Sequence, residues 1–295
     1  MSDRHLFNIA DHTVSIIFSS TDKNDIDLLP SFEPFRMDQT NVEPLLTLYV
    51  DDGLQPIEKE KRHRLRAFDT GNGDTVVFQL PEGGYQFIIR DTSCRDCALL
   101  ICNTDFSVCR CALNGDKAMR AFGLNNAVMM TYAYAACHHQ TLLIHASCVA
   151  HGGYGYPFLA KSGTGKSTHS SLWLQFVDDT ELMNDDNPII RVIDGVSYIY
   201  GSPWSGKTPC YRNIRRPLGA LVGIERATAN SIERLSTVPA FATILVACSS
   251  MSWDSNINDA ICNTVSDVIG KTPVFTLHCL PDKEAASLCS ETIVR

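Results

Sequence analysis

A glycine-rich segment in the middle of the chain carries the residue types that bind nucleotide phosphates. Residues 160–168 read Ala-Lys-Ser-Gly-Thr-Gly-Lys-Ser-Thr and fit the pattern Gly-x-x-x-x-Gly-Lys-Ser/Thr at every position except the first. Gly163 and Gly165 have no Cβ, so the backbone can curl and turn successive N–H groups toward phosphate oxygens. Lys166 can bring a positive charge to the β- and γ-phosphates, and the hydroxyl of Ser167 can bind Mg²⁺. The segment therefore predicts a site for ATP and Mg²⁺.

The segments on either side of this loop have the character that a phosphate site requires. The apolar run Tyr156–Leu159 enters the loop like a strand, and Ser167–Phe176 leaves it like a helix. The N-terminal end of a helix favours anions, because its N–H groups are free and its dipole is positive there. A glycine-rich turn that binds nothing is the weaker interpretation, since the glycines, the lysine and the serine occur in register. The residues expected to contact the nucleotide are Ser162, Gly163, Thr164, Gly165, Lys166, Ser167 and Thr168.

Two adjacent carboxylates follow the loop at a spacing that suits a neighbouring strand. Asp185 comes nineteen residues after Lys166, within the sequence Asn-Asp-Asp-Asn at positions 184–187. In phosphoryl transfer one carboxylate can hold Mg²⁺ while another accepts the proton of the attacking hydroxyl. We expect Asp185 to be the base and Asp186 the metal ligand, although the two roles can be exchanged. The alternative is a solvated turn, because Asp and Asn favour turns.

A histidine precedes the loop, in the run Thr141–Ala150 that is predicted to be a single strand. A histidine in such a strand is more often a hydrogen-bonded core residue than a catalytic one. The place of His145 ahead of the phosphate loop nevertheless favours a position beside the phosphates or the aspartates. We therefore expect His145 to act in catalysis together with Lys166 and Asp185.

A second loop, Gly201–Lys207, follows a predicted strand and carries an aromatic residue, a cation and two hydroxyls. Three arginines come soon after it, and arginine suits carboxylate or phosphate recognition because its planar group binds bidentately. We expect the acceptor of the phosphoryl group to bind here, through Trp204, Lys207, Arg212, Arg215 and Arg216. The alternatives are an ordinary turn with the tryptophan packed on the core, and arginines paired with surface acids such as Glu225 or Glu233.

The composition limits the class of protein. The chain has 295 residues, 44% of them hydrophobic, and a formal net charge of −8 with a pI of about 5.5. This charge argues against general binding of nucleic acid or of an anionic membrane. The N-terminal residues lack the apolar region of a signal peptide, and the most apolar helical run, Ala127–Cys137, is too short to cross a bilayer. We expect a cytoplasmic protein, for which a homo-oligomer is left open.

Twelve cysteines are spread along the chain. Without a secretion signal, reduced thiols are expected. A cluster in the first half, made of Cys94, Cys97, Cys102, Cys109 and Cys111, could hold zinc. Its second pair lacks the two-residue spacing of zinc ribbons, and thiols in alternating strands often serve as small core residues. We therefore expect the cysteines to be metal-free.

Turn signals and apolar periodicity divide the chain into a β-rich domain with a connecting helix, 1–138, and a second domain, 139–295. The helix is predicted over Asp116–His138, and Glu58–Arg66 is interpreted as a solvated run of charges. In the first domain the predicted strands are Thr13–Phe18, Leu45–Val50, Thr75–Leu80, Tyr85–Arg90, Ala98–Asn103 and Ser107–Leu113. Strands and helices of the second domain do not alternate strictly, so the expected class is α/β of the α+β type, with a mixed sheet.

The residues around the phosphate loop, taken together, resemble the HPr kinase/phosphorylase family and, more loosely, the phosphoenolpyruvate carboxykinases. The resemblance covers about residues 142–221 and rests on His145, the loop 160–167 and the pair Asp185-Asp186. It implies a P-loop kinase domain that transfers the γ-phosphoryl group of Mg·ATP to a serine-like hydroxyl on a small molecule, peptide or protein. Thr168 and Asn187 stand where HPr kinases have a glutamate and an arginine, so the resemblance does not extend to HPr as the acceptor. The alternative from another class is a nucleotide-binding sensor or scaffold without turnover.

Overall fold

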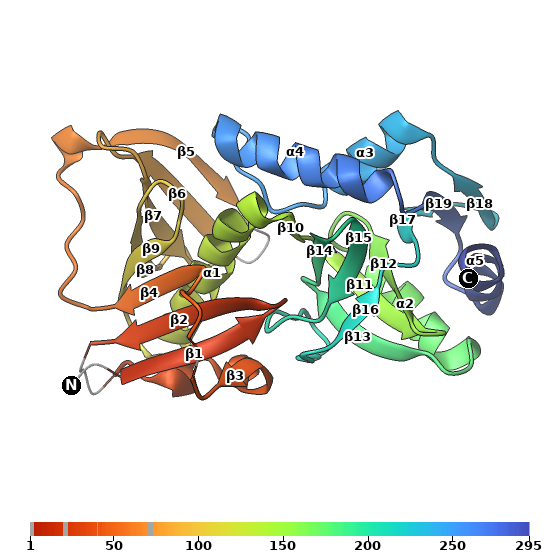
Figure 1. Cartoon of the computed structure of the whole chain (residues 1–295), viewed down its shortest axis with the longest axis horizontal. Coiled ribbons are helices and arrows are strands. Elements are labelled where there is room, and N and C mark those ends of the chain that lie inside the picture. The colour runs from red at the N-terminus through yellow and green to blue at the C-terminus, as the bar shows by residue number, and fades with distance from the viewer. Residues whose placement is uncertain (1–2, 20–22, 40, 70–72, 295) are drawn as a thin grey trace. The chain divides into compact units, whose positions relative to one another are not determined.

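The computed structural model describes residues 3–19, 23–39, 41–69 and 73–294 (Figure 1). The chain divides into two compact units, residues 1–136 and 137–295, and each unit combines strands and helices. The expected α+β class with mixed sheets is thereby confirmed at the level of secondary structure. None of the helices in the described part of the chain has the length and apolar character needed to cross a membrane.

The described residues of the first unit form one nine-stranded sheet, in the order β3-β1-β2-β4-β9-β8-β7-β6-β5. Its neighbouring strands are antiparallel except at β2–β4 and β4–β9, which are parallel. The strands are β1 (Asp3–Ile9), β2 (His12–Phe18), β3 (Arg36–Met37), β4 (Leu46–Val50), β5 (His63–Asp69), β6 (Asp74–Gln79), β7 (Tyr85–Arg90), β8 (Asp96–Cys102) and β9 (Val108–Leu113). Three short 3₁₀ helices accompany them, at Ile26–Leu28, Pro30–Phe35 and Lys59–Lys61.

One long helix, α1 (Lys117–Ala136), packs on this sheet against β7, β8, β9 and β4. Asp116 begins the helix, because its carboxylate accepts a hydrogen bond from the N–H of Met119 at 3.0 Å. On the packed face the Tyr134 and Phe106 rings lie 5.1 Å apart, and the Tyr132 hydroxyl donates to the carbonyl of Ile9. The helix is thus part of the core of the first unit as well as the segment that leads to the second unit.

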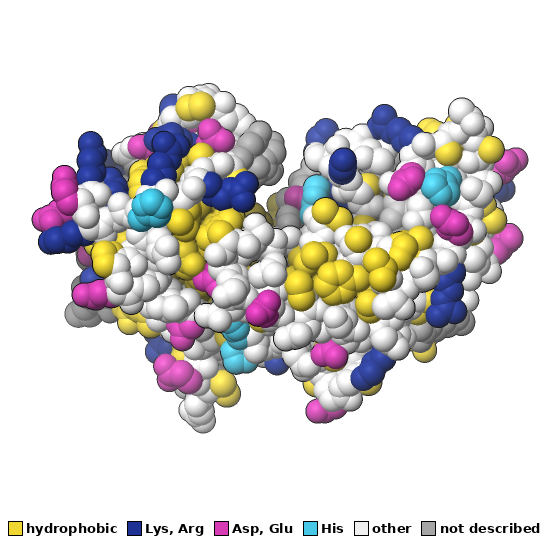
Figure 2. Space-filling view, turned by 90° about the horizontal axis from the view of Figure 1, so that it is seen from above, with side chains coloured by type: hydrophobic (Ala, Val, Ile, Leu, Met, Phe, Trp, Pro, Cys, Tyr) yellow, Lys and Arg dark blue, Asp and Glu magenta, His cyan; other side chains and the backbone are white. Residues whose placement is uncertain are grey.

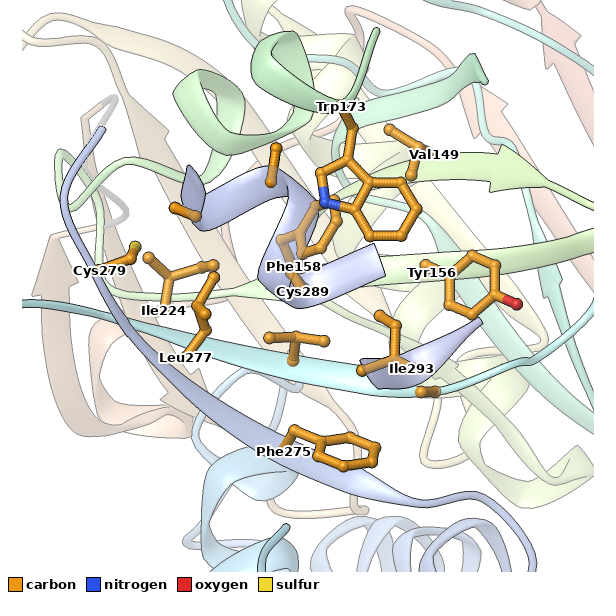
Figure 3. Close-up of a cluster of buried hydrophobic side chains, with 14 residues drawn as sticks. Val149, Tyr156, Phe158, Trp173, Ile224, Phe275, Leu277, Cys279, Cys289 and Ile293 are labelled. Atoms are coloured by element: carbon orange, nitrogen blue, oxygen red, sulfur yellow. The ribbon is translucent and has the colours of Figure 1, made fainter. Parts of the chain in front are cut away.

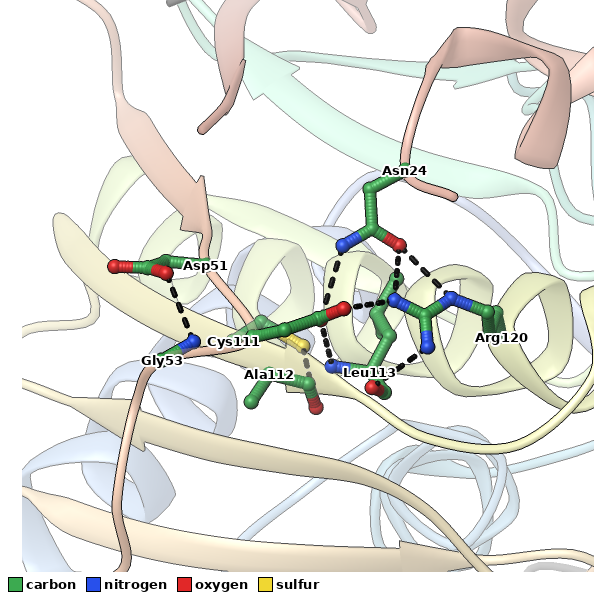
Figure 4. Close-up of polar contacts among 8 residues, drawn as sticks. Asn24, Asp51, Gly53, Cys111, Ala112, Leu113 and Arg120 are labelled. Carbon is green, nitrogen blue, oxygen red and sulfur yellow. Dashed lines mark hydrogen bonds and ion pairs between the residues drawn. The ribbon is translucent and has the colours of Figure 1, made fainter. Parts of the chain in front are cut away.

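A buried polar cluster joins the start of α1 to two loops of the first unit (Figure 4). Arg120 is only 5% exposed, and its guanidinium donates to the side chains of Asn24 and Asp52 and to the carbonyl of Leu113. Burial alone would raise the pKa of Asp52, but hydrogen bonds from Leu113, Asn24 and Arg120 outweigh it and lower that pKa. The charge of Arg120 is therefore compensated where it is buried.

Two sheets make up the described part of the second unit, a six-stranded one in the order β13-β11-β12-β17-β19-β18 and a four-stranded one in the order β10-β14-β15-β16. The strands are β10 (Thr141–Leu143), β11 (Ala146–His151), β12 (Tyr154–Leu159), β13 (Glu181–Asp186), β14 (Ile189–Ile193), β15 (Val196–Tyr200), β16 (Arg215–Pro217), β17 (Leu221–Arg226), β18 (Ser231–Arg234) and β19 (Val274–Cys279). The helices are α2 (Lys166–Phe176), α3 (Thr237–Leu245), α4 (Ser255–Ile269), α5 (Lys283–Ile293) and a short 3₁₀ turn at Cys137–His139.

The helix that follows the glycine loop is fixed by the core of the six-stranded sheet. Trp173 of α2 is fully buried, and its ring lies 5.5 Å from that of Phe158 in β12 and 5.7 Å from that of Tyr156. Ile224 of β17 and Cys289 of α5 complete this part of the core (Figure 3). Because burying an indole and aliphatic side chains stabilises by several kcal/mol, this packing holds the start of α2 at the end of β12.

The predicted strand Thr141–Ala150 is in fact two strands that belong to different sheets. Ile144 forms an isolated bridge with Cys248, and the N–H of His145 donates to the carbonyl of Ala247 at 2.8 Å. The backbone at these two residues is therefore paired outside both sheets. The continuous apolar run hid this change of sheet, and His145 lies between β10 and β11 instead of in the middle of a strand.

Candidate phosphate-binding site

The glycine loop joins β12 to α2, as the motif requires. Gly163 and Gly165 have φ angles of 75° and 134°, which residues with a Cβ rarely adopt. A Cβ at either position would meet no atom within 4 Å, so backbone conformation is what demands glycine there. The N–H of His169 donates to the carbonyl of Gly165 at 2.9 Å, which starts the helical hydrogen bonding of α2. Ser162, Ser167 and Thr168 are exposed on the loop and on the first turn of the helix.

An arginine that the sequence analysis did not single out braces the loop. Arg226 ends β17, and its Nε and Nη2 atoms donate to the carbonyls of Thr164 and Gly163 at 2.9 and 2.5 Å. β17 is the parallel neighbour of β12, so the carboxyl ends of both strands lie at the same edge of the sheet. A charged residue at the end of the apolar run Leu221–Ile224 was the signal that could have identified it.

Lys166 is largely buried, with an exposed fraction of 8%. Its ammonium donates to the carbonyl of Ala160 at 3.2 Å, and Nζ lies 2.9 Å from Nε2 of His145. Burial lowers the pKa of Lys166, while the charges of Asp186 and Asp185 oppose that shift. The lysine is therefore held inside the loop, facing the two carboxylates.

His145 contacts Asp186 as well as Lys166. Its Nε2 atom lies 3.1 Å from Oδ1 of Asp186, and 41% of its side chain is exposed. The ring is thus placed beside the aspartates and outside the apolar core. The distance to each partner suits a hydrogen bond, and the proton on Nε2 decides which of the two bonds forms.

The aspartate pair lies at the carboxyl end of β13, beside the start of β11. Ala146 is paired with Asp186 on one side and with Leu159 on the other, so the site forms where β11, β12 and β13 meet. Asp185 is 3% exposed, and its buried Oδ2 atom has no hydrogen-bond partner among the described residues. Asp186 accepts a hydrogen bond from the Asn187 amide at 2.8 Å and has a φ of 154°, a backbone conformation unusual for a non-glycine residue.

The loop Gly201–Lys207 packs directly on this pair. The N–H of Gly206 donates to the carbonyl of Asp185, and Ser205 forms an isolated bridge with Asp186. A Cβ on Gly206 would lie 2.8 Å from the Asp185 carbonyl oxygen and 3.2 Å from Cβ of Asp186, so this close approach requires glycine. Lys207, the next residue, is exposed.

A buried asparagine holds the same loop in place through hydrogen bonds of its side chain. Asn184 is fully buried, and its amide donates to the carbonyl of Trp204 at 2.9 Å and to the hydroxyl of Ser202 at 3.2 Å. Its side-chain oxygen accepts from the N–H of Asn187 at 2.9 Å. Asn184 therefore couples the carboxyl end of β13 to the second loop and has a structural role.

Trp204 does not present its ring to a ligand, because the residue is only 2% exposed. Its predicted role in acceptor binding is corrected by this burial. The packing of an indole against the interior stabilises the loop that carries it.

The arginine run lies away from the aspartates. Arg212 and Arg216 pair with Glu181 at 2.8 and 3.3 Å, at the start of β13. β13 spans six residues, and at about 3.3 Å per residue its ends are separated by roughly 16 Å. The guanidinium of Arg215 lies 5.0 Å from the centre of the Tyr198 ring. The structure therefore does not unite these arginines with the phosphate loop, and Arg212 and Arg216 pair with Glu181 in place of Glu225 or Glu233.

The donors at the site suit a hard divalent cation. Mg²⁺ is bound by one or two carboxylates together with substrate phosphates and water, and Asp185, Asp186 and Ser167 carry oxygen atoms of the kind it prefers. The orphaned Oδ2 atom of Asp185 is the observation that fits such an ion. Among the described residues, at this site as elsewhere, no three His, Cys, Asp or Glu side chains gather in a way that could hold a metal ion by themselves. Among the five clustered cysteines, Cys94 is exposed and the others are buried as free thiols. That the purified protein is free of zinc stays a prediction.

Comparison of the chain with protein-family models and with curated proteins found no match. The functional argument therefore rests on the geometry of the site.

Proposed function

We propose that the second unit is a kinase, related to the HPr kinases, that transfers the γ-phosphoryl group of Mg·ATP to a hydroxyl of a small molecule, peptide or protein. The observation that carries the proposal is the meeting of Lys166, His145 and Asp186 within hydrogen-bond distance. These three residues come from a glycine loop and two different strand ends, and each has the chemistry that phosphoryl transfer uses.

The loop supplies binding and charge stabilisation. Its backbone amides and the first turn of α2 favour the phosphates, and Lys166 can leave His145 to reach the β- and γ-phosphates. Arg226 supports this step because its hydrogen bonds to the carbonyls of Gly163 and Thr164 fix the conformation of the loop. A loop with a fixed conformation loses less entropy when the nucleotide binds.

The exposure of the two aspartate side chains supports the reverse of the roles that were first expected for them. Asp186 has 31% of its side chain exposed, so an incoming hydroxyl can reach it, whereas Asp185 is buried and has an unpartnered oxygen. We assign Asp186 as the base and Asp185, with Ser167, as the residues that would hold Mg²⁺. The ion, when bound, neutralises charge on the β- and γ-phosphates.

The proposed step balances as a single displacement. The acceptor oxygen gives its proton to the carboxylate of Asp186 and forms a bond to the γ-phosphorus. The bond between that phosphorus and the bridging oxygen breaks, and ADP leaves with the electron pair. We place the acceptor beside the loop Gly201–Lys207, because the backbone of this loop contacts Asp185 and Asp186. Lys207 is exposed beside Gly206 and is the residue proposed to meet an anionic group on the acceptor.

The direct test is transfer of label from [γ-³²P]ATP in the presence of Mg²⁺ and a panel of hydroxyl acceptors, namely serine, glycerol and serine-containing peptides, together with a cell extract. The full chain should label an acceptor and release ADP, and Lys166→Ala and Asp186→Asn should do neither. ATP binding without ADP release under any of these conditions would contradict the kinase and favour a nucleotide-binding sensor or scaffold.

A further inference from the structure

A groove of about 400 Å³ lies on the nine-stranded sheet of the first unit, far in sequence from the phosphate loop. Its floor is apolar and consists of Val76, Phe78 and Ile88. Val76 is paired with Ile88 across β6 and β7, whereas the neighbouring pair Val77 and Phe87 points the other way. Phe87 contacts Phe106, which packs on α1, so the groove occupies the face of the sheet opposite that helix.

Four cations surround this floor, namely Lys59, Arg62, Arg64 and Arg90. In Figure 2 Lys and Arg side chains gather around hydrophobic ones on the left of the view. Arg90 is neutralised by Asp96 at 2.6 Å. In the described ranges neither Lys59 nor Arg64 forms an ion pair, and the nearby Glu58 pairs with Lys61 instead. A protein with a net charge of −8 thus concentrates uncompensated positive charge at one apolar groove.

One of these cations is already oriented over the floor. The guanidinium of Arg62 lies 4.5 Å from the centre of the Phe78 ring. Its Nη1 atom is buried without a hydrogen-bond partner among the described residues. A buried donor that lacks a partner costs free energy, and an anion in the groove would satisfy it.

The rim is held over the sheet by a specific backbone contact. The N–H of Ile57 donates to the side-chain oxygen of Gln86 at 2.8 Å, and Gln86 is fully buried in β7. This contact fixes the segment that carries Lys59 and Arg62. The cationic rim is therefore built into the fold of the first unit.

We propose that this groove binds a small amphipathic anion, meaning a carboxylate, sulfonate or phosphate attached to an aromatic or branched apolar body. The apolar body packs on Val76, Phe78 and Ile88, and the anionic group accepts hydrogen bonds from Arg62 and Arg64. Its volume falls within the range of about 300–1,000 Å³ that is typical of sites for small molecules. Guanidinium groups suit such anions because they bind them bidentately. The site is independent of the proposed kinase activity.

The test uses two fluorescent probes that differ in one anionic group. 1-Anilinonaphthalene-8-sulfonate should bind the full chain saturably, and the neutral analogue N-phenyl-1-naphthylamine should bind more weakly. Arg64→Glu should weaken sulfonate binding about tenfold, the order expected when one charge-assisted hydrogen bond is lost. The matched control Lys61→Glu makes the same charge change outside the groove and should leave the affinity within about twofold, since an exposed charge outside the site contributes little.

Competition identifies the anionic group. Displacement of the probe by 1-naphthoate indicates a carboxylate ligand, and displacement by 1-naphthyl phosphate indicates a phosphate ligand. Three results would overturn the proposal: displacement by neither compound, equal affinity of Arg64→Glu and the wild type, or equal binding of the neutral and anionic probes.

Discussion

The ammonium nitrogen of Lys166 lies 2.9 Å from Nε2 of His145. The same ring nitrogen lies 3.1 Å from a carboxylate oxygen of Asp186. A single nitrogen cannot serve both partners at once, because it accepts from the ammonium only when unprotonated and donates to the carboxylate only when protonated. If Lys166 leaves His145 and moves to the phosphates, the imidazole can hydrogen-bond Asp186 instead and so orient its carboxylate.

This arrangement predicts that His145→Ala separates turnover from nucleotide binding. Loss of the imidazole leaves the Asp186 carboxylate held, among the described residues, by Asn187 alone, and misplacement of a reacting group by about 1 Å costs on the order of 100-fold in rate. We expect kcat to fall by that order while the Kd for Mg·ATP changes by less than about threefold, since His145 touches no loop amide. Equal loss in kcat and in ATP affinity would instead assign His145 to nucleotide binding.

The two aspartates should differ in their dependence on the metal. Asp185→Asn removes the charge proposed to hold Mg²⁺, so its activity should recover in part when Mg²⁺ is raised to tens of millimolar, roughly a tenfold excess over usual assays. Asp186→Asn removes the proposed base, and no metal concentration should restore its activity. Phosphoryl transfer by both variants, measured over a series of Mg²⁺ concentrations, tests this difference. Recovery of Asp186→Asn with metal, but not of Asp185→Asn, would reverse the assignment.

Gly206 should be intolerant of a side chain. Its Cβ would lie 2.8 Å from the carbonyl oxygen of Asp185, so Gly206→Ala must displace either the second loop or the aspartates. We expect transfer to fall at least about tenfold with little change in ATP affinity, because the phosphate loop is untouched. Gly270→Ala is the matched control, as its Cβ would meet only ordinary contacts at 3.4 Å or beyond. Normal transfer by Gly206→Ala would show that the second loop does not position the catalytic carboxylates.

His169 makes the stability of the second unit depend on pH. Burial lowers the pKa of His169 from 6.5 to about 4, and its ring accepts a hydrogen bond from the indole of Trp173. The unfolded chain takes up the proton first as the pH falls, so this contribution is fully present above pH 6.5 and is lost toward pH 4. The loss amounts to about 3 kcal/mol in the free energy of unfolding.

Urea unfolding at pH 7.5 and pH 5 measures about 2 kcal/mol of this loss, because the folded protein takes up the proton only near pH 4. Trp173, Trp204 and Trp253 all belong to the second unit, so their fluorescence reports on that unit alone. His169→Gln keeps an acceptor for the indole but cannot titrate, and its free energy of unfolding should fall less between the two pH values. An equal fall in both proteins would remove His169 as the cause.

Local sequence signals were sufficient for much of the fold and for the position of the glycine loop between a strand and a helix. Turn residues separated the strands β2, β4, β6, β7, β8 and β9, and glycine spacing identified the loop between β12 and α2. The same signals could not identify β5, because its basic residues resemble a solvated surface run. An edge strand tolerates such charges, since they protect it from pairing with other chains.

Contacts between residues distant in sequence account for what could not be predicted. The pairing of Arg212 with Glu181 spans thirty-one positions, and that of Arg226 with Gly163 spans sixty-three. No local pattern encodes either contact, because each depends on which strands become neighbours in the sheet. The change of sheet at His145 also depends on distant partners. An apolar run predicts a single strand unless the pairing partners of its two halves are known.

The central claim is that the loop 160–168 binds the phosphates of Mg·ATP through Lys166. Isothermal titration calorimetry of the full chain with Mg·ATP tests it most directly, with Lys283→Ala as a control that removes an exposed lysine of the same unit. Loss of the charge-assisted contact in Lys166→Ala should cost about 1.5–3 kcal/mol, or roughly 10- to 100-fold in Kd, while the control matches the wild type. Equal ATP affinity in the wild type and in Lys166→Ala would contradict the account.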